Sequence, residues 1–296
     1  MRGRANRLIP ILGMIWCASA LGQDETHPLN RERHFDGSRA SIDLEMSPDG
    51  ALLVTSDTIG SVLWSVADAT PIQEISEVGK IVFSPDGSHF LLVGKGIGKW
   101  SLEGKVLAYF GEDEPMVTAL SYGQDGKQLV TGHDNGEILL WEMPVGILQD
   151  RWLAHSFEEV VGLVGTTDMQ SLFITNGREI KEWRIPQGSF VRALESVSSI
   201  TDLDISPNGH TLAASRSGGA SLWEIESGKP LWNRNFGALF KPINPQTADF
   251  STDGSYLLIG RTLWSSDGEW LRAYGCSFVG AWPPLSGRGR QSRINC

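Results

Sequence analysis

Cysteine is scarce in this chain of 296 residues, which contains only three. One of them, Cys17, falls in an N-terminal segment that we expect to be removed, so Cys276 and Cys296 would be the only pair left, and whether they bond to each other stays open. A fold held together by disulfide bonds is therefore excluded. Beyond the first 22 residues the chain also has no apolar run long enough to cross a membrane, so no span is expected after cleavage.

The spaced motifs of common catalytic and metal centres are missing as well. The chain has no Gly-x-Ser-x-Gly, no His-Glu-x-x-His, no Cys-x-x-Cys and no Gly-x-x-x-x-Gly-Lys-Ser/Thr loop. The segment Gly94–Lys99 is rich in Gly and Lys, but it lacks the Ser or Thr and precedes a strand instead of a helix, so we interpret it as a turn. The sequence predicts no catalytic residue, no metal and no cofactor.

Basic residues are few in the body of the chain. Six of the 25 Lys and Arg residues lie near the two ends, which leaves 19 basic residues against 35 acidic ones in between. A body this acidic repels phosphate backbones and anionic lipid, so nucleic acid is not an expected partner.

The first 22 residues have the pattern of a secretory signal peptide. They begin with three arginines, continue with the apolar run Leu8–Trp16 and end in the small residues Ala18-Ser19-Ala20. We expect cleavage and a secreted or periplasmic location. Bulky Trp16 argues against acylation of Cys17 as a lipoprotein, and an uncleaved anchor is the remaining alternative.

A turn followed by a tryptophan recurs six times along the chain. The turn is complete as Ser-Pro-Asp-Gly at 47–50 and 84–87, varies at 123–126, 206–209 and 251–254, and is degenerate near Thr167-Asp168-Met169-Gln170. Successive tryptophans are 36 to 42 residues apart. These tryptophans are Trp64, Trp100, Trp141, Trp183, Trp223 and Trp264.

Each repeat contains four short segments of strand length and composition, which is typical of a propeller blade. Apolar residues on both faces of the Trp-bearing segment indicate packing between neighbouring blades. We therefore predict an all-β propeller at 23–275 with six blades. Their approximate repeats are 41–76, 80–110, 116–153, 159–194, 199–236 and 246–274. Residues 276–296 form an irregular tail or the start of a further blade, so the alternatives are a six-bladed ring closed by Pro28–Phe35 and a seven-bladed ring with an incomplete last blade.

The Ser-Pro-Asp-Gly turns and the Leu-Trp dipeptides at their fixed distance resemble the WD40-repeat family over about residues 28–275. The family's Asp after the Trp is absent from every repeat. The resemblance implies a buried hydrogen-bonded set of His, Ser or Thr, Asp and Trp within a blade. In the first blade Thr55 or Ser56 would supply the hydroxyl, whereas the third has Thr131 and lacks the His. The other expected members of the set are His34, Asp57, Asp134 and His155.

The resemblance also implies a partner-binding end face, where connections between blades meet the turns between second and third strands. Exposed Phe side chains among charges would suit such a surface. We interpret His133 as a plain exposed turn residue that is able to reach a ligand, and His89 as a scaffold or solvent-facing residue. The candidate face comprises Phe35, Glu112, Asp113, Glu114, His133, Asn135, Phe157, Arg178, Arg216, Phe240, Lys241 and Arg261.

These features favour a non-enzymatic protein-interaction scaffold that binds a protein or peptide. The alternative is an exported propeller hydrolase of the lactonase-like kind, with its site at the mouth of the central channel. A third hypothesis is a fragment without independent function, because the repeat pattern stops after Pro283-Pro284.

Overall fold

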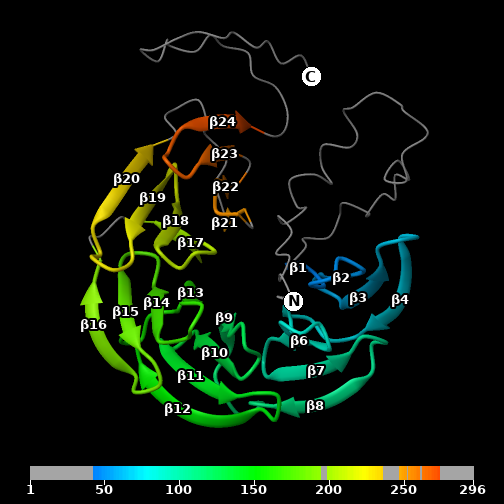
Figure 1. Ribbon diagram of the computed structural model, residues 1–296. Helices are drawn as coiled ribbons and strands as arrows, with labels where there is room; N and C mark the ends of the chain where they lie inside the picture. Colours follow the sequence, from blue (N-terminus) through cyan, green and yellow to red (C-terminus); the bar gives the residue numbers. More distant parts are fainter. Residues whose placement is uncertain (1–42, 195–198, 236–246, 252, 261, 274–296) are drawn as a thin grey trace, which may run out of the picture.

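The computed structural model describes residues 43–194, 199–235, 247–251, 253–260 and 262–273, and these residues form strands and no helix (Figure 1). The strands pair as six antiparallel sheets, each made of four consecutive strands in chain order. We call these sheets blades 1 to 6, and the six-bladed all-β fold predicted from the sequence is confirmed.

The strand bounds follow the chain. Blade 1 has β1 (Asp43–Met46), β2 (Leu52–Ser56), β3 (Ser61–Ser65) and β4 (Thr70–Ile75); blade 2 has β5 (Lys80–Phe83), β6 (His89–Val93), β7 (Ile97–Ser101) and β8 (Val106–Phe110); blade 3 has β9 (Val117–Tyr122), β10 (Gln128–His133), β11 (Glu137–Glu142) and β12 (Ile147–Leu153). Blade 4 has β13 (Gly162–Gly165), β14 (Ser171–Thr175), β15 (Ile180–Arg184) and β16 (Ser189–Ala193); blade 5 has β17 (Ile200–Ile205), β18 (Thr211–Arg216), β19 (Gly219–Glu224) and β20 (Pro230–Asn235); blade 6 has β21 (Ala248–Phe250), β22 (Tyr256–Ile259), β23 (Thr262–Ser265) and β24 (Trp270–Ala273).

The blades follow an arc in which the first strand of each lies innermost and the fourth outermost (Figure 1). Neighbouring first strands are in contact, as β1 is with β5 and β13 is with both β9 and β17. Side chains tie these strands together: Asp43 of β1 accepts a hydrogen bond from Ile81 N of β5 at 2.7 Å. The closing strand expected at Pro28–Phe35, the signal segment and the tail 276–296 lie outside the described residues.

The cores lie between blades. Five buried apolar clusters occupy the five junctions between successive blades. At the junction of blades 2 and 3, for example, Leu91 and Val93 of β6 pack with Leu129 and Trp141 of blade 3. Each sheet therefore buries apolar side chains against a neighbour, as the two-faced Trp strand predicted.

The recurring turn connects the first and second strands of each blade. In blade 1 the Ser47 hydroxyl donates to Asp49 Oδ1 at 2.6 Å, and Gly50 closes the turn in the left-handed region with φ 73°. Blade 4 makes the same turn one residue earlier than its sequence suggested, with Thr166 donating to Asp168 at 2.7 Å and Met169 taking the glycine position at φ 52°. The degenerate copy is therefore 166–169.

Antiparallel pairing gives every blade two distinct ends. Turns between first and second strands, and between third and fourth strands, lie together at what we call the turn end. Turns between second and third strands lie with the connections between blades at the opposite, loop end. The described residues contain no helix able to cross a membrane.

Candidate interaction surface

A buried chain of polar groups in blade 3 leads from its core to the loop end. Trp141 Nε1 donates to the Thr131 hydroxyl at 2.9 Å, and this hydroxyl lies 2.9 Å from His133 Nε2. His133 Nδ1 is 2.8 Å from the carbonyl oxygen of Pro115. Since a carbonyl only accepts, Nδ1 carries the proton and Nε2 accepts from Thr131. Burial holds the pKa of His133 below its ordinary value, so the ring is neutral.

This chain corrects two expectations. His133 was expected as an exposed turn residue on the partner-binding face, but it is fully buried and supplies the histidine that blade 3 was thought to lack. Asp134, expected in the buried set, is exposed. The physical reason is that β10 runs on through His133, so strand alternation places His133 on the same face as buried Thr131 and leaves Asp134 in the turn that follows.

His133 also holds the two connections on either side of blade 3. Its ring bonds Pro115 in the connection from blade 2, and its carbonyl accepts from Val160 N, in the connection to blade 4, at 3.1 Å. Val160 in turn accepts from the Thr118 hydroxyl at 2.7 Å. The two connections are therefore fastened to one blade.

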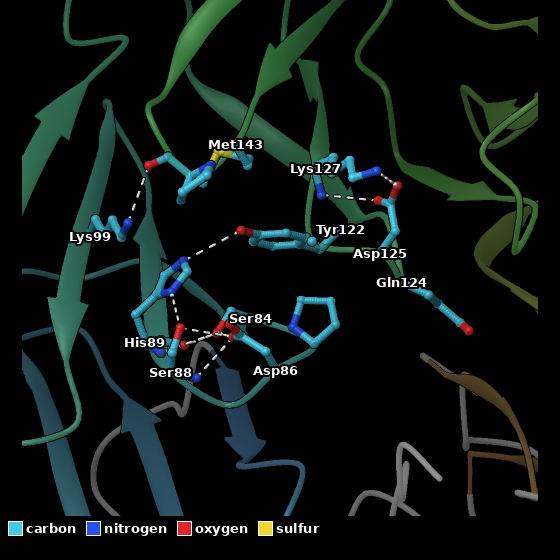
Figure 2. Close-up of a pocket in the computed structure, with 13 residues that line it drawn as sticks. Ser84, Asp86, Ser88, His89, Lys99, Tyr122, Gln124, Asp125, Lys127 and Met143 are labelled. Carbon is cyan, nitrogen blue, oxygen red and sulfur yellow. Dashed lines mark hydrogen bonds and ion pairs between the residues drawn. The ribbon is translucent and has the colours of Figure 1, made fainter. Parts of the chain in front are cut away.

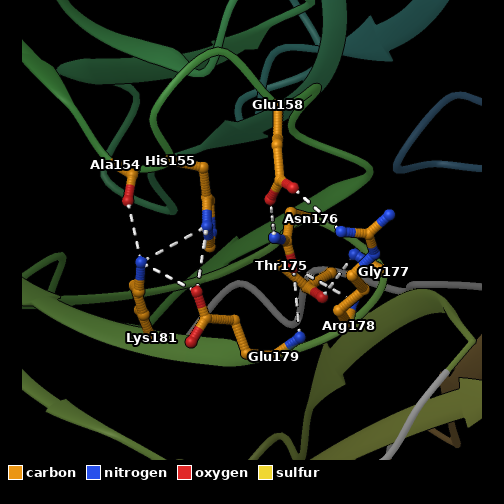
Figure 3. Close-up of polar contacts among 9 residues, drawn as sticks. All are labelled: Ala154, His155, Glu158, Thr175, Asn176, Gly177, Arg178, Glu179 and Lys181. Atoms are coloured by element: carbon orange, nitrogen blue, oxygen red, sulfur yellow. Dashed lines mark hydrogen bonds and ion pairs between the residues drawn. The ribbon is translucent and has the colours of Figure 1, made fainter.

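The connection from blade 3 to blade 4 is fastened to blade 4 as well (Figure 3). Lys181 Nζ lies 2.9 Å from Glu179 Oε1 and donates to the Ala154 carbonyl at 3.3 Å, and buried His155 Nδ1 lies 3.5 Å from the same Glu179 oxygen. Three residues further along, Glu158 accepts from Asn176 Nδ2 and from Arg178 Nη1, the latter at 3.0 Å (Figure 3).

His155 lies buried, as its expected structural role requires, but the chain of blade 3 is broken in blade 4. Ile174 occupies in blade 4 the position that Thr131 occupies in blade 3. Thr131 comes two residues after the leucine that pairs with Trp141, and Ile174 comes two residues after the leucine that pairs with Trp183. Trp183 Nε1 and His155 Nε2 have no hydrogen-bond partner among the described residues. Burial first, and then the charge of Lys181, lower the pKa of His155.

Phe157 stands between these two anchors and points into solvent. Its side chain is 91% exposed, and its backbone is in the left-handed region with φ 60°. A non-glycine residue in this region costs about 1 kcal/mol or more, and such strain concentrates at functional sites. Met116, in the neighbouring connection, is also exposed. The firmly held loop end of blades 3 and 4 therefore presents two large apolar side chains.

The other predicted face residues are divided between this region and elsewhere. Glu112 and Asp113 are exposed, whereas Glu114 lies 2.7 Å from Arg151 of β12. Asn135 closes its own turn by accepting from Glu137 N at 3.0 Å.

Two further groups of predicted residues lie away from this region. Arg216 lies in blade 5, where it bonds Asn233 and Asn235. In blade 1, Trp64 Nε1 donates to Thr55 and not to Ser56, and Asp57 accepts from Ile59 N within its own turn. The remaining predicted residues fall outside the described ranges: His34, Phe35, Phe240, Lys241 and Arg261.

No group of three or more His, Cys, Asp or Glu in the described part of the chain is placed to hold a metal ion. A family model described as "WD domain, G-beta repeat" matches residues 104–142 and 188–224. Each match begins just before the outer strand of one blade, β8 or β16, and ends with the Trp-bearing strand of the next, β11 or β19.

Proposed function

Since the chain belongs to the WD40-repeat family, we propose that it is a protein-interaction scaffold whose partner docks on the loop end of blades 3 and 4. The observation that carries this proposal is Phe157, an aromatic side chain held in solvent by a connection that is bonded on both sides. Aromatic residues dominate binding energy at interfaces, and a surface ordered in advance pays less entropy on binding.

The charge around Phe157 defines the partner more closely. Exposed acidic residues belong to the same two connections as the two apolar side chains and to the adjoining turn; they are Glu112, Asp113, Asp134 and Glu159. The exposed Arg178 is paired with Glu158. A partner segment that combines an aromatic or aliphatic residue with Lys or Arg would complement this surface, and the net charge of −10 would speed its approach.

Random-peptide display on the immobilised protein tests this proposal. We expect enriched peptides to carry an apolar residue beside basic ones, and Phe157→Ala to weaken their binding by about tenfold or more. Phe190→Ala is the matched control, because Phe190 is exposed on the outer strand β16 of blade 4, away from the connection. Peptides that are acidic, or that bind Phe157→Ala as well as the unaltered protein, would contradict the proposal.

The scaffold acts without catalysis and outside the cytoplasm in this proposal. The absence of catalytic motifs and the N-terminal pattern of residues 1–22 support these two points. N-terminal sequencing should find the mature chain beginning near residue 23 outside the cytoplasm. Full-length protein in the cytoplasm, or turnover of lactone and ester substrates by purified protein, would refute them.

A further inference from the structure

The junction between blades 2 and 3 differs from other junctions at the turn end. Elsewhere the glycine of one turn lies against the turn of the preceding blade: a Cβ on Gly87 would lie 3.7 Å from Pro48 Cδ, and one on Gly254 would lie 3.5 Å from Pro207 Cδ. A Cβ on Gly126 of blade 3 would meet no atom of the described chain within 4 Å. The turns of blades 2 and 3 are therefore not stacked, and a cavity of about 480 Å³ lies between them.

Two departures from the repeat accompany this opening. The turn of blade 3 is Gly123-Gln124-Asp125-Gly126, which lacks the Ser and Pro of the complete form. The residue before the blade tryptophan is Lys99 in blade 2, whereas it is a leucine in blades 1, 3, 5 and 6. Lys99 Nζ reaches across to the Pro144 carbonyl of blade 3 at 3.2 Å. A charged side chain thus replaces an apolar one in the wall of the cavity.

An ordered row of polar groups lines the cavity (Figure 2). The Ser88 hydroxyl donates to Asp86 Oδ1 at 2.8 Å, so the buried His89 ring must donate from Nδ1 to Ser88 Oγ at 2.9 Å. His89 Nε2 is then an acceptor and faces the Tyr122 hydroxyl at 3.4 Å, a long contact. His89, expected as a scaffold or solvent-facing residue, therefore lines the cavity.

The charge states follow from these surroundings. Hydrogen bonds from Ser84 and Ser88 lower the pKa of Asp86 to about 2, and burial followed by the charge of Lys99 lowers the pKa of His89. Burial raises the pKa of Tyr122 to about 12. Lys127 also lines the cavity but lies 3.8 Å from Asp125, so near neutral pH Lys99 is the cation that remains for a ligand, beside a neutral imidazole and a phenol that is able to donate.

We propose that this cavity binds a small ligand carrying one carboxylate, which pairs with Lys99 and accepts from Tyr122 while an apolar group packs against Met143 and Pro144. The volume suits a ligand the size of an acylated amino acid or a dipeptide. Ionised Asp86 favours a monoanion over a phosphate dianion, because one ammonium does not offset two further negative charges beside a carboxylate. The site is at the turn end and is independent of the loop-end surface.

Saturation-transfer NMR with N-acetyl derivatives of alanine, leucine and phenylalanine tests the proposal on the mature protein. We expect at least one acid to bind at millimolar concentration and its uncharged amide to bind about tenfold more weakly. Lys99→Leu, which copies blades 1, 3, 5 and 6, should weaken binding of the acid by a similar factor, and Tyr122→Phe by a few fold. Lys105→Met, in the exposed turn of the same blade, is the control and should leave binding unchanged.

Three outcomes would overturn the proposal: no binding of any of the three acids, equal binding of acid and amide, or undiminished binding by Lys99→Leu. Thermal unfolding of each variant shows that it is folded. Since Tyr122→Phe removes only a hydroxyl, it keeps the test valid if Lys99→Leu fails to fold.

Discussion

Replacement of Thr131 by valine should destabilise the protein strongly although the two side chains have the same shape. The Thr131 hydroxyl is the only link between Trp141 Nε1 and His133 Nε2 that the described residues show, with both distances at 2.9 Å, and all three residues are buried. A buried polar group left without a partner costs about 1–3 kcal/mol. With two groups orphaned, we expect Thr131→Val to lower the free energy of unfolding by about 2–4 kcal/mol, a large share of the stability of a typical domain.

Blade 4 offers the reciprocal experiment. Ile174 occupies the equivalent position, and there Trp183 Nε1 and His155 Nε2 are already unpaired within the described chain. Threonine at 174 would place a hydroxyl at the position from which Thr131 bonds Trp141 in blade 3, whereas valine would not. We therefore expect Ile174→Thr to be more stable than Ile174→Val by about 1 kcal/mol, which reverses the usual preference for valine in a core.

Urea titration followed by tryptophan fluorescence measures both pairs of variants, with calorimetric midpoints as a second measure because unfolding of repeat proteins can depart from two states. Thr131→Ser is the control, since it keeps the hydroxyl and loses one methyl group, at a cost of about 1 kcal/mol. The reasoning is refuted if Thr131→Val lies within about 0.5 kcal/mol of Thr131→Ser, or if Ile174→Val is the more stable variant of its pair.

Three further predictions concern stability. The free energy of unfolding should fall between about pH 7 and pH 5, because the unfolded state takes up protons near the ordinary histidine pKa of 6.5 while burial lowers the folded-state pKa of His89, His133 and His155. The titration is carried out on the Asp202→Asn variant, because burial raises the pKa of Asp202 to about 7 and this carboxyl by itself would increase the free energy of unfolding as the pH falls. A flat profile would contradict the prediction. Phe157→Gly should raise the thermal midpoint while abolishing peptide binding, because glycine adopts the φ of 60° without strain; a lower midpoint would show that the backbone is unstrained. Arg192→Met should cost about 3 kcal/mol in urea titration, because buried Glu182 keeps its hydrogen bond from the Ser171 hydroxyl but loses its ion-pair partner at 2.6 Å, and the added change Glu182→Leu should restore most of this stability.

The fold could be predicted because its signals are local. The turn Ser47-Pro48-Asp49-Gly50 needs only its own side chains and one glycine, and four short strands separated by such turns can pair without long-range information. The spacing of the tryptophans then sets the number of blades.

The candidate surface was predicted only in part, because it depends on geometry that spans blades. Phe157 was among the residues proposed for it, but its exposure results from anchors at His155 and Glu158 that bond residues about twenty positions away. His133 was assigned the opposite environment because the sequence suggested a turn beginning at His133, whereas β10 extends through it and alternation places its ring beside Thr131.

By itself, the sequence determined the repeat, the all-β class and the place of the tryptophan in each blade, because turn chemistry and strand alternation act over a few residues. Only the tertiary structure decided which polar groups meet. The relay from Trp141 through Thr131 to His133 depends on where β10 ends and on the Pro115 carbonyl of the connection beside it, and the open junction at Lys99 depends on how blades 2 and 3 approach. Packing between blades therefore turns nearly equivalent repeats into distinct sites.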